Sequence, residues 1–369
     1  MKNSPKHILL VTSEFPPLPG GIGNHALNLA SFLSKNNYEV EVLADQRTTN
    51  SEESDFDATQ NFKIHRIPLT KIRFFMYLSR IWVIFQLIRS KDVVLASGKF
   101  PLWLVAFSSL FFNKKFIAVI HGSEVNFQTA MLRRSINWSL KRFSNVIAVS
   151  NFTKGLVDHL NLKSVEVIPN GFNTSDWSKG TNHKRNLEGH PKLITVGNVT
   201  QRKGQLNVIR QLPEVIKIYP ELHYHMVGLP TEKDEFLKHA QYLKVEDHIS
   251  FHGRVKHEDL RDFLTASDIF VMLSSPTSSG DVEGFGIAVL EANYLGLPAI
   301  GALGCGIEDA IDDYSSGILI EHDDTGQFLN AINAIIGNKT KFSNNAIDWA
   351  ERHGWGKIIK KYIDVIETE

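Results

Sequence analysis

The sequence predicts an α/β protein of two domains, each built on a doubly wound parallel sheet. In both halves of the chain, short apolar runs rich in β-branched residues alternate with segments of helical periodicity. A polar, unperiodic stretch, residues 175–191 (SDWSKGTNHKRNLEGHP), separates the halves and is typical of a linker. The length of 369 residues, 43% of them hydrophobic, also fits two domains with ample cores.

The overall composition narrows the class of protein. The formal net charge is zero, so bulk charge indicates no nucleic-acid partner. A single cysteine, Cys305, rules out an internal disulfide and fits a reducing cytoplasm. The apolar run at residues 7–11 is far too short for the core of a signal peptide. We therefore expect a cytoplasmic protein.

The first half opens with an apolar run at His7–Thr12, which suits a central parallel strand. A proline- and glycine-rich loop follows, and then a helix from about Asn24 to Lys35. Further strands are expected at Asp92–Ser97, Phe116–Ile120, Asn145–Ser150 and Ser164–Ile168. A turn at residues 169–173 (PNGFN) ends this half.

The glycines before the first helix allow three interpretations. Residues 21–26 (GIGNHA) match the dinucleotide fingerprint, and Asp45 ends the second strand, where a ribose-binding acid would lie. An NAD site would need its first glycine tight against the strand, whereas a proline-rich loop intervenes here. The other two interpretations are a helix start that needs small residues and a flexible loop whose backbone approaches a ligand across a cleft.

The stretch from Asn61 to Lys115 is strongly basic, with ten Lys or Arg residues and one acid, Asp92. It contains two apolar helical patterns, at residues 74–88 and 101–112, neither long enough to cross a bilayer. Core helices on a parallel sheet are the preferred interpretation. The alternative adds contact with an anionic membrane, because basic charge beside exposed aromatic residues favours anionic lipid.

Two further patterns are interpreted as structural. Asp55-Phe-Asp57 looks like the metal-binding motif D-x-D, but it lies in a polar run with no apolar strand before it. We expect a solvated loop there and no metal. His223 and His225 would share one face of a strand, and the nearest acids lack the spacing of metal ligands.

The second half repeats the strand–helix pattern. Strands are expected at residues 192–196, 222–227, 248–251 and 267–273. The loop Gly197–Gly204 follows the first of them. Arg202 and Lys203, with Gly204 at a helix start, supply the cations and backbone donors that a phosphate group needs.

Glu283 and Glu291 lie eight positions apart in the run EGFGIAVLE, between the strand at 267–273 and a helix at 287–295. The first amide groups of such a helix have no internal partner, and the helix dipole is positive there, so the turn favours an anion. The two carboxylates suit hydroxyl groups on either side of a diphosphate. The pattern therefore indicates a nucleotide-sugar.

This E-x7-E spacing resembles the donor motif of the retaining GT-B glycosyltransferases, family 4 in particular. The Gly20-Gly21 pair, the His121-Gly122 turn, the Lys203-Gly204 step and the turn at residues 251–255 resemble further motifs of that family. The resemblance covers nearly the whole chain and implies the GT-B fold, two Rossmann-like domains facing a deep interdomain cleft. The implied bounds are 1–172 for the acceptor-side domain, 173–191 for the linker, 192–347 for the donor domain and 348–369 for helices crossing back.

By resemblance, the reaction moves a sugar from a nucleotide diphosphate-sugar to a hydroxyl acceptor, with retention at the anomeric carbon and without metal or other cofactor. Glu283 would hold the donor sugar, Glu291 the ribose and His121 the far side of the sugar. Lys203 would stabilise the leaving diphosphate. The family's other basic position is Asn198 here, with Arg202 as the candidate replacement. The remaining residues expected to line the site are Gly20, Gly21, Arg254, Val255, Gly284, Phe285, Gly286 and Ile287.

Three other functions stay as alternatives: a GT-B-fold sugar-nucleotide epimerase or phosphorylase, an NAD-linked dehydrogenase, and a two-lobed sugar-binding protein without catalysis. The basic, aromatic first half favours a lipid-linked or membrane-proximal acceptor, used in polysaccharide or glycolipid biosynthesis at the inner face of the membrane. No nucleic-acid partner is expected. The sequence does not specify the base, the sugar or the acceptor.

Overall fold

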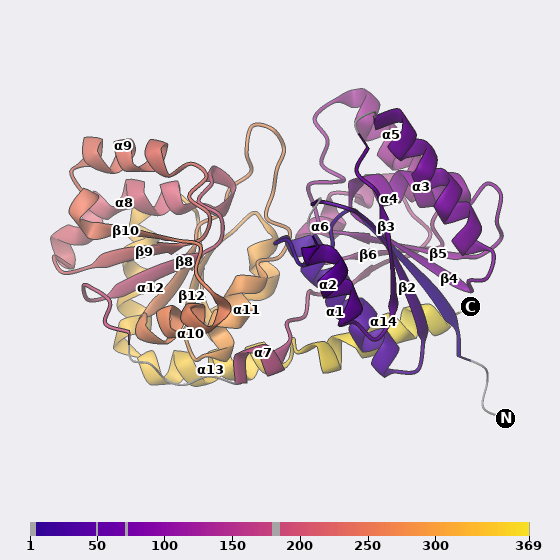
Figure 1. Ribbon diagram of the computed structural model, residues 1–369. Helices are drawn as coiled ribbons and strands as arrows, with labels where there is room; N and C mark the ends of the chain where they lie inside the picture. Colours follow the sequence, from indigo (N-terminus) through magenta and orange to yellow (C-terminus); the bar gives the residue numbers. More distant parts are fainter. Residues whose placement is uncertain (1–4, 49–50, 71–72, 179–184, 369) are drawn as a thin grey trace. The chain divides into compact units, whose positions relative to one another are not determined.

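The structure is a computed structural model that describes residues 5–48, 51–70, 73–178 and 185–368. Its backbone contacts divide the chain into two compact units. The first comprises Met1–Gly171 together with Trp355–Glu369, and the second comprises Phe172–Gly354. Each unit is an α/β fold of its own, with helices on both faces of a parallel sheet (Figure 1).

In the described part of the first unit, seven parallel strands form one sheet in the order β3-β2-β1-β4-β5-β6-β7. The direction of winding reverses between β1 and β4, and this switch point is where open α/β sheets bind ligands. The strands are β1 (His7–Thr12), β2 (Glu39–Asp45), β3 (Lys63–Ile67), β4 (Val93–Ser97), β5 (Lys115–Ile120), β6 (Asn145–Ala148) and β7 (Val165–Val167).

The last helix of the chain belongs to the first unit, where it packs beside α1 (Figure 1). Lys115 Nζ donates to the carbonyl oxygens of Val365 and Ile366, at 2.6 and 3.4 Å, and so complements the negative end of that helix. The helices of this unit are α1 (Gly21–Lys35), α2 (Glu52–Ala58), α3 (Arg73–Ile88), α4 (Lys99–Ser108), α5 (Ala130–Leu140), α6 (Asn151–Gly155), η1 (Asp158–Leu160) and α14 (Trp355–Glu367).

The second unit repeats this winding. Its described residues form a parallel sheet of six strands in the order β10-β9-β8-β11-β12-β13, with the switch point between β8 and β11. The strands are β8 (Lys192–Val196), β9 (His223–Val227), β10 (Ile249–Gly253), β11 (Ile269–Met272), β12 (Ala299–Ala302) and β13 (Gly317–Ile320). The helices are α7 (Thr174–Ser178), η2 (Gln201–Lys203), α8 (Gln205–Ile218), α9 (Lys233–Leu243), η3 (Glu246–His248), α10 (His257–Ala266), α11 (Ile287–Tyr294), η4 (Gly306–Ala310), α12 (Thr325–Gly337) and α13 (Lys339–Glu351).

The central strands are buried along their length because helices cover both faces of each sheet. Every residue of β4 and β11 is buried, which explains why their sequences are continuous apolar runs rather than alternating ones. Each unit has its own hydrophobic core, assembled from its strands and the helices above them. These two cores hold the carboxyl ends of the strands, where the candidate site residues lie, in fixed positions.

Several expected boundaries differ from the structure. Helix α4 begins at Lys99 and ends at Ser108 instead of spanning residues 101–112, and the residues that follow form a turn. Helix α1 begins at Gly21, so the glycines expected in a flexible loop lie at a helix start. Strands β3 and β13 were not expected. In β3 (KIHRI) two apolar residues stand among three polar ones, so the strand does not appear as an apolar run. The expected strand–helix turn at residues 301–307 lies at the end of β12.

The expected domain limits also differ in detail. The segment expected as a linker, residues 173–191, lies within the second unit, where α7 contacts α11 and Leu187 is buried. Residues 179–184 of that segment lie outside the described residues. Of the two helices expected to cross back from residue 348, only α14 belongs to the first unit, because α13 packs against α11.

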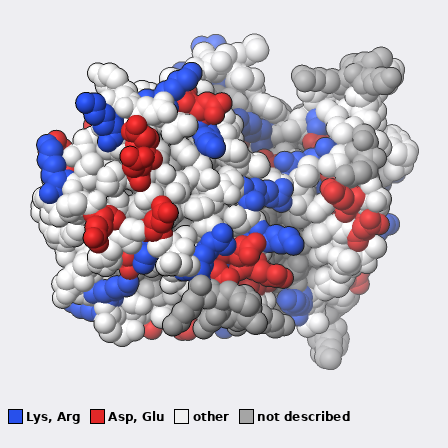
Figure 2. Space-filling view, turned by 60° about the vertical axis from the view of Figure 1, so that its left-hand side comes forward, with Lys and Arg blue, Asp and Glu red and all other residues white. Residues whose placement is uncertain are grey.

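Charged side chains of both signs are mixed on the face of the molecule seen in Figure 2. Figure 2 shows lysines and arginines interspersed with acids on one face, with no extended region of a single sign, in keeping with the net charge of zero. None of the helices in the described ranges combines the length and the apolar character needed to span a bilayer.

Candidate active site

A cluster of two cations and one carboxylate lies at the switch point of the second sheet. Arg202 and Lys203 are in η2, shortly after β8, and Glu283 lies after the neighbouring strand β11. Lys203 Nζ is 2.8 Å from Glu283 Oε2, and the Arg202 guanidinium donates to the same oxygen. Neighbouring parallel strands end at the same edge of the sheet. Arg202 and Glu283, which are 81 positions apart in the sequence, are therefore in contact.

Two glycines let this cluster form. The methylene stem of Lys203 crosses Gly197, so that a β-carbon at Gly197 would lie 3.1 Å from Lys203 Cε. Gly204 has a left-handed backbone, with φ at 79°, and presses against the Leu273 carbonyl at the end of β11. A side chain at Gly204 would collide with the backbone of Leu273, and one at Gly197 would displace the stem of Lys203.

Glu283 is ionised although it is only 8% exposed. Burial alone would raise the pKa of its carboxyl, but the charges and hydrogen bonds of Lys203 and Arg202 outweigh burial and hold the pKa below its usual value. The cluster therefore contains two cations and one anion. The net charge of these three side chains is therefore positive, as a phosphate site requires.

The turn from Gly284 to Ile287 is held from behind by a second glycine-rich turn. Gly286 takes a left-handed backbone, with φ at 90°, and forms the N-cap of α11. The Gly306 amide donates to the Glu283 carbonyl at 2.9 Å, and a β-carbon at Gly306 would overlap the backbone of Gly284. Phe285 is buried beside this contact and fixes the start of α11. These contacts hold the turn rigidly against the N-terminus of the helix.

Glu291 lies about one turn into α11. Burial raises the pKa of its carboxyl to about 7, and the nearby charge of Lys203 opposes that rise. The structure records no ion pair for Glu291 among the described residues. The Glu291 carboxylate is therefore more readily available to ligand hydroxyl groups than the Glu283 carboxylate, which already binds two cations.

The other expected donor-site residues are less closely connected to the cluster. Asn198 is exposed, and its carbonyl oxygen accepts from Gln205 Nε2 at 3.1 Å. Arg254 and Val255 follow β10 on the far side of β9 and β8 from Glu283, and Arg254 is exposed. Within the described ranges the structure brings neither Asn198 nor Arg254 onto the carboxylate, whereas Arg202 lies on it directly.

In the first unit, His121 follows β5 at the carboxyl edge of the sheet. Its Nε2 is 2.9 Å from Ser97 Oγ at the end of β4. Burial lowers the pKa of His121 to about 4, so the ring is neutral at pH 7. The Glu124 side chain accepts a hydrogen bond from the His121 amide, and burial raises the pKa of that carboxyl to about 7.

A second histidine, which the sequence analysis did not single out, orients His121. The ring of His25, on α1, meets the His121 ring edge-on with centroids 5.0 Å apart. His25 Nε2 is in turn 2.9 Å from Tyr362 Oη on α14. His25 could have been noticed as the histidine after the glycine pair, but no local signal links it to a tyrosine 337 positions away.

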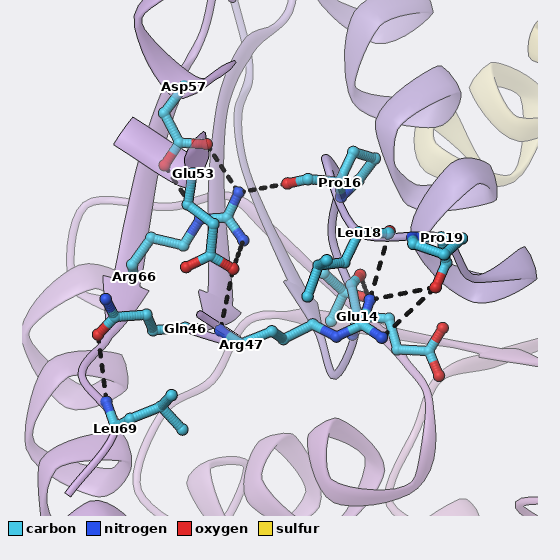
Figure 3. Close-up of polar contacts among 11 residues, drawn as sticks. Glu14, Pro16, Leu18, Pro19, Gln46, Arg47, Glu53, Asp57, Arg66 and Leu69 are labelled. Carbon is cyan, nitrogen blue, oxygen red and sulfur yellow. Dashed lines mark hydrogen bonds and ion pairs between the residues drawn. The ribbon is translucent and has the colours of Figure 1, made fainter. Parts of the chain in front are cut away.

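Gly20 and Gly21 end a proline-rich loop that two arginines hold in place (Figure 3). The Arg47 guanidinium donates to the carbonyl oxygens of Leu18 and Pro19 at 3.4 Å. Arg66 Nη2 donates to the Pro16 carbonyl at 2.5 Å. Specific contacts to Pro16, Leu18 and Pro19 therefore hold the loop that leads into the glycine pair.

The D-x-D segment is a helix rather than the expected solvated loop. Asp57, in α2, accepts two hydrogen bonds from the Arg66 guanidinium, at 2.7 and 3.0 Å. Glu53, one turn earlier, accepts from the Arg47 amide at 2.9 Å and lies 3.5 Å from Arg66 Nη1 (Figure 3). These long-range ion pairs stabilise a helix that its own polar sequence does not predict.

Asp45 does not have the role that a dehydrogenase would require. Both of its carboxylate oxygens accept from Arg80, at 2.8 and 2.5 Å, and the guanidinium also stacks on Phe100. Arg80, which interrupts the apolar pattern of α3, is buried in this pair. The carboxylate that would bind the ribose of NAD is thus engaged by Arg80.

The histidines of β9 have protein partners. His223 Nε2 is 2.8 Å from Ser250 Oγ, and His225 Nδ1 is 3.0 Å from His252 Nε2 on β10. Within the described ranges, no group of three or more His, Cys, Asp or Glu side chains is arranged to hold a metal ion.

Two family models match the chain, one for each half. The model described as "Glycosyltransferase Family 4" matches residues 19–176, and the model described as "Glycosyl transferases group 1" matches residues 179–353. The chain belongs to the family 4 glycosyltransferases. This glycosyltransferase has its cation cluster in the half matched by the second model, and His121 and the glycine pair in the half matched by the first.

Curated relatives match this glycosyltransferase over most of their length. A GDP-mannose-dependent alpha-(1-6)-phosphatidylinositol monomannoside mannosyltransferase from Mycolicibacterium smegmatis is 25% identical, over 94% of this chain and 93% of the relative. A GDP-mannose-dependent monoacylated alpha-(1-6)-phosphatidylinositol monomannoside mannosyltransferase from Corynebacterium glutamicum is 26% identical, over 86% and 85% of the two chains.

Solved structures establish the fold of this glycosyltransferase as GT-B. Sucrose-phosphate synthase from Thermosynechococcus elongatus superposes with a TM-score of 0.82 at 18% identity, over 98% of both chains. Anabaena HepE, solved in complex with UDP and glucose, gives a TM-score of 0.77 at 18% identity, over 98% of this chain and 99% of the other. The two Rossmann-like units predicted from the sequence are confirmed.

Proposed function

We propose that this glycosyltransferase transfers a sugar, with retention at the anomeric carbon, from a nucleotide diphosphate-sugar to a hydroxyl group of a lipid-linked acceptor. The observation that carries the proposal is the cluster at the switch point of the second sheet. Arg202 and Lys203 supply two positive charges beside the N-terminus of α11, and Glu291 lies one turn further along that helix.

The chemistry follows from where charge develops. As the glycosidic bond breaks, the leaving diphosphate gains negative charge, and preorganised cations stabilise that state more than the ground state. Lys203 and Arg202 supply the positive charge that a divalent metal would otherwise provide, so we propose a metal-independent reaction. The departing phosphate takes the proton of the acceptor hydroxyl. His121, which is neutral at pH 7, serves as a hydrogen-bonding group for the sugar.

We propose GDP-mannose as the donor and a phosphatidylinositol-type glycolipid as the acceptor. The two relatives described above are named as GDP-mannose-dependent phosphatidylinositol monomannoside mannosyltransferases, and the match spans most of their length. The enzyme would work at the cytoplasmic face of the membrane, where sugar nucleotides are present.

A thermal-shift panel of GDP-mannose, UDP-glucose and ADP-glucose tests the proposal. A donor present at 100 times its Kd should stabilise the folded protein by about 2.7 kcal/mol, and we expect that effect from GDP-mannose. Incubation with the same donor and a phosphatidylinositol mannoside acceptor should yield a lipid carrying one more mannose, and NMR of the product reports the anomeric configuration. Chelator should leave the rate unchanged. Failure of every sugar nucleotide to bind would overturn the proposal.

Donor affinity is expected to rise with pH through the ionisation of Glu291. Its pKa of about 7 leaves much of the carboxyl protonated near neutrality, and only the ionised form offers two negatively charged acceptor oxygens to the ribose hydroxyls. The Kd for the donor should therefore be about tenfold higher at pH 6 than at pH 8. Calorimetric titrations across this range measure the effect. In Glu291→Gln the profile should be flat, and an unchanged slope in that variant would refute the role of Glu291.

We also propose that the basic stretch of residues 61–115 contacts an anionic membrane through α3 and the end of α4. Phe75, Leu78 and Trp82 follow one another at helical spacing on the exposed side of α3. Phe107 and Phe111 are exposed beside them, and Phe85 joins the two sets, with its ring centroid 5.3 Å from that of Phe111. Arg66 and Arg80 of this stretch are paired with acids outside it. The cations that remain exposed, among them Lys63, Arg89 and Lys99, are those that favour anionic lipid. Lys71 lies outside the described residues.

Replacing Trp82 by alanine is expected to lower partitioning onto anionic vesicles at least about tenfold, because burying a large apolar side chain contributes about 1.5–3 kcal/mol. Trp82 is 64% exposed, so the change should not affect folding. Flotation with phosphatidylglycerol-containing vesicles measures the partitioning. Tyr242→Ala, at an exposed aromatic residue of the second unit, is the matched control and should float like the unmodified protein. Equal flotation of both variants, or binding that salt does not weaken, would contradict the proposed surface.

A further inference from the structure

The carboxylate of Glu283 occupies the cations that a diphosphate needs. It is bound by Lys203 Nζ at 2.8 Å and by the Arg202 guanidinium, both at Oε2. Its side chain is 10% exposed, compared with 15% for Lys203 and 32% for Arg202. The carboxylate thus acts as an internal anion, in contact with both groups that would otherwise bind phosphate oxygens.

A bare diphosphate meets an obstacle at such a site. It would have to draw Arg202 and Lys203 away from Glu283, which would leave a buried carboxylate close to the bound phosphates and short of partners. An unpaired buried charge is strongly unfavourable, and like charges repel strongly at low local dielectric. A nucleoside diphosphate therefore cannot use the full attraction of the two cations.

An intact sugar nucleotide removes this obstacle. The sugar carries hydroxyl groups next to the diphosphate, and hydroxyl donors can replace the cations on the Glu283 carboxylate. The carboxylate then stays hydrogen-bonded while Arg202 and Lys203 turn to the phosphates. The free-energy cost of separating Glu283 from its cations is compensated only when the sugar is attached.

We propose that Glu283 acts as an anion filter, which makes the site prefer the intact nucleotide diphosphate-sugar over the nucleoside diphosphate that transfer leaves behind. This inference rests on the proposed function, because it takes the cluster as the donor site. Once the sugar has left, the Glu283 carboxylate pairs again with Lys203 and Arg202, and the affinity of the site for the product nucleotide falls. The same residue that holds the donor sugar therefore promotes release of the product.

Glu291 provides the internal comparison. Both acids belong to one nine-residue run, but the structure records cation partners for Glu283 and, among the described residues, no ion pair for Glu291. Removing the charge of Glu283 should free two cations for phosphate. Removing the charge of Glu291 should free none, and should weaken the hold on the ribose that donor and product share.

Isothermal titration with GDP and GDP-mannose, and with UDP and UDP-glucose, tests the inference on the full-length protein. The unmodified protein should bind the sugar nucleotide more tightly than the matching diphosphate. In Glu283→Gln, which keeps the size and the hydrogen-bonding capacity of the side chain, the Kd for the diphosphate should fall at least tenfold, and the preference for the sugar nucleotide should disappear. Glu291→Gln should weaken both ligands alike.

Each outcome separates the two proposals. If the unmodified protein binds neither a sugar nucleotide nor a diphosphate, the proposed function fails. If it binds both, and Glu283→Gln binds the diphosphate no more tightly than the unmodified protein does, the filter alone is overturned. Thermal melts check that Glu283→Gln is folded. If Glu283→Gln is not folded, Glu283→Ala, which also removes the charge, is used in its place. The inference then requires the same gain in diphosphate affinity from Glu283→Ala.

Discussion

Replacement of Lys203 by alanine is expected to lower kcat/KM by about 10²–10³-fold, the loss typical of one missing oxyanion donor. Lys203 Nζ is one of two cations on the Glu283 carboxylate, and its side chain is largely buried, so the charge acts with little screening by water. Because negative charge grows on the leaving diphosphate during bond cleavage, kcat should fall more than KM rises. Steady-state kinetics with the donor identified by thermal shift measure both constants.

Lys217→Ala is the matched control for that experiment. Lys217 lies on α8, which begins two residues after Lys203, but its side chain is 65% exposed and pairs with Glu214 on the surface. An exposed pair of this kind contributes little, so the control should keep its activity and its stability. A loss of similar size in both variants would show that the effect is not specific to the diphosphate site.

Replacement of Trp355 by alanine is expected to destabilise the protein by about 3–5 kcal/mol, as for other large aromatic residues removed from a core. Trp355 opens α14 and is 1% exposed. Its ring contacts His25 and Phe32 of α1, with centroids 5.3 and 6.1 Å apart, so it joins the last helix to the first. Denaturant unfolding followed by circular dichroism measures the loss, which should appear in the transition of the first unit.

Trp82→Ala makes the same chemical change at an exposed position of the same unit. Its free energy of unfolding should stay within about 0.5 kcal/mol of the unmodified protein, as is usual for surface substitutions. A comparable loss in both variants would contradict the docking of α14 through Trp355. Because His25 also contacts His121, Trp355→Ala should lower activity even under conditions where the variant is fully folded.

Local sequence patterns predicted an element correctly where residues close in sequence determine its structure. The apolar run of β11 and the helical spacing of α11 both appear in the structure within two residues of their expected limits. Gly286 lies at the left-handed N-cap, where a strand turns into a helix. Helix α2 was missed for the opposite reason: its own residues are polar, and Arg66, which holds it through Asp57 and Glu53, lies on a later strand.

The two Rossmann-like units, the glycine turns and the E-x7-E run could be predicted from the amino-acid order alone, because periodicity, turn chemistry and helix starts depend on residues within a few positions of one another. The folded chain was needed to find that Glu283 binds Lys203 and Arg202, that Arg80 pairs with Asp45 and that Tyr362 hydrogen-bonds to His25. These contacts depend on which strands are neighbours in a sheet and on where a distant helix docks. Both are set by the burial of whole faces against one another, which no short stretch of sequence contains.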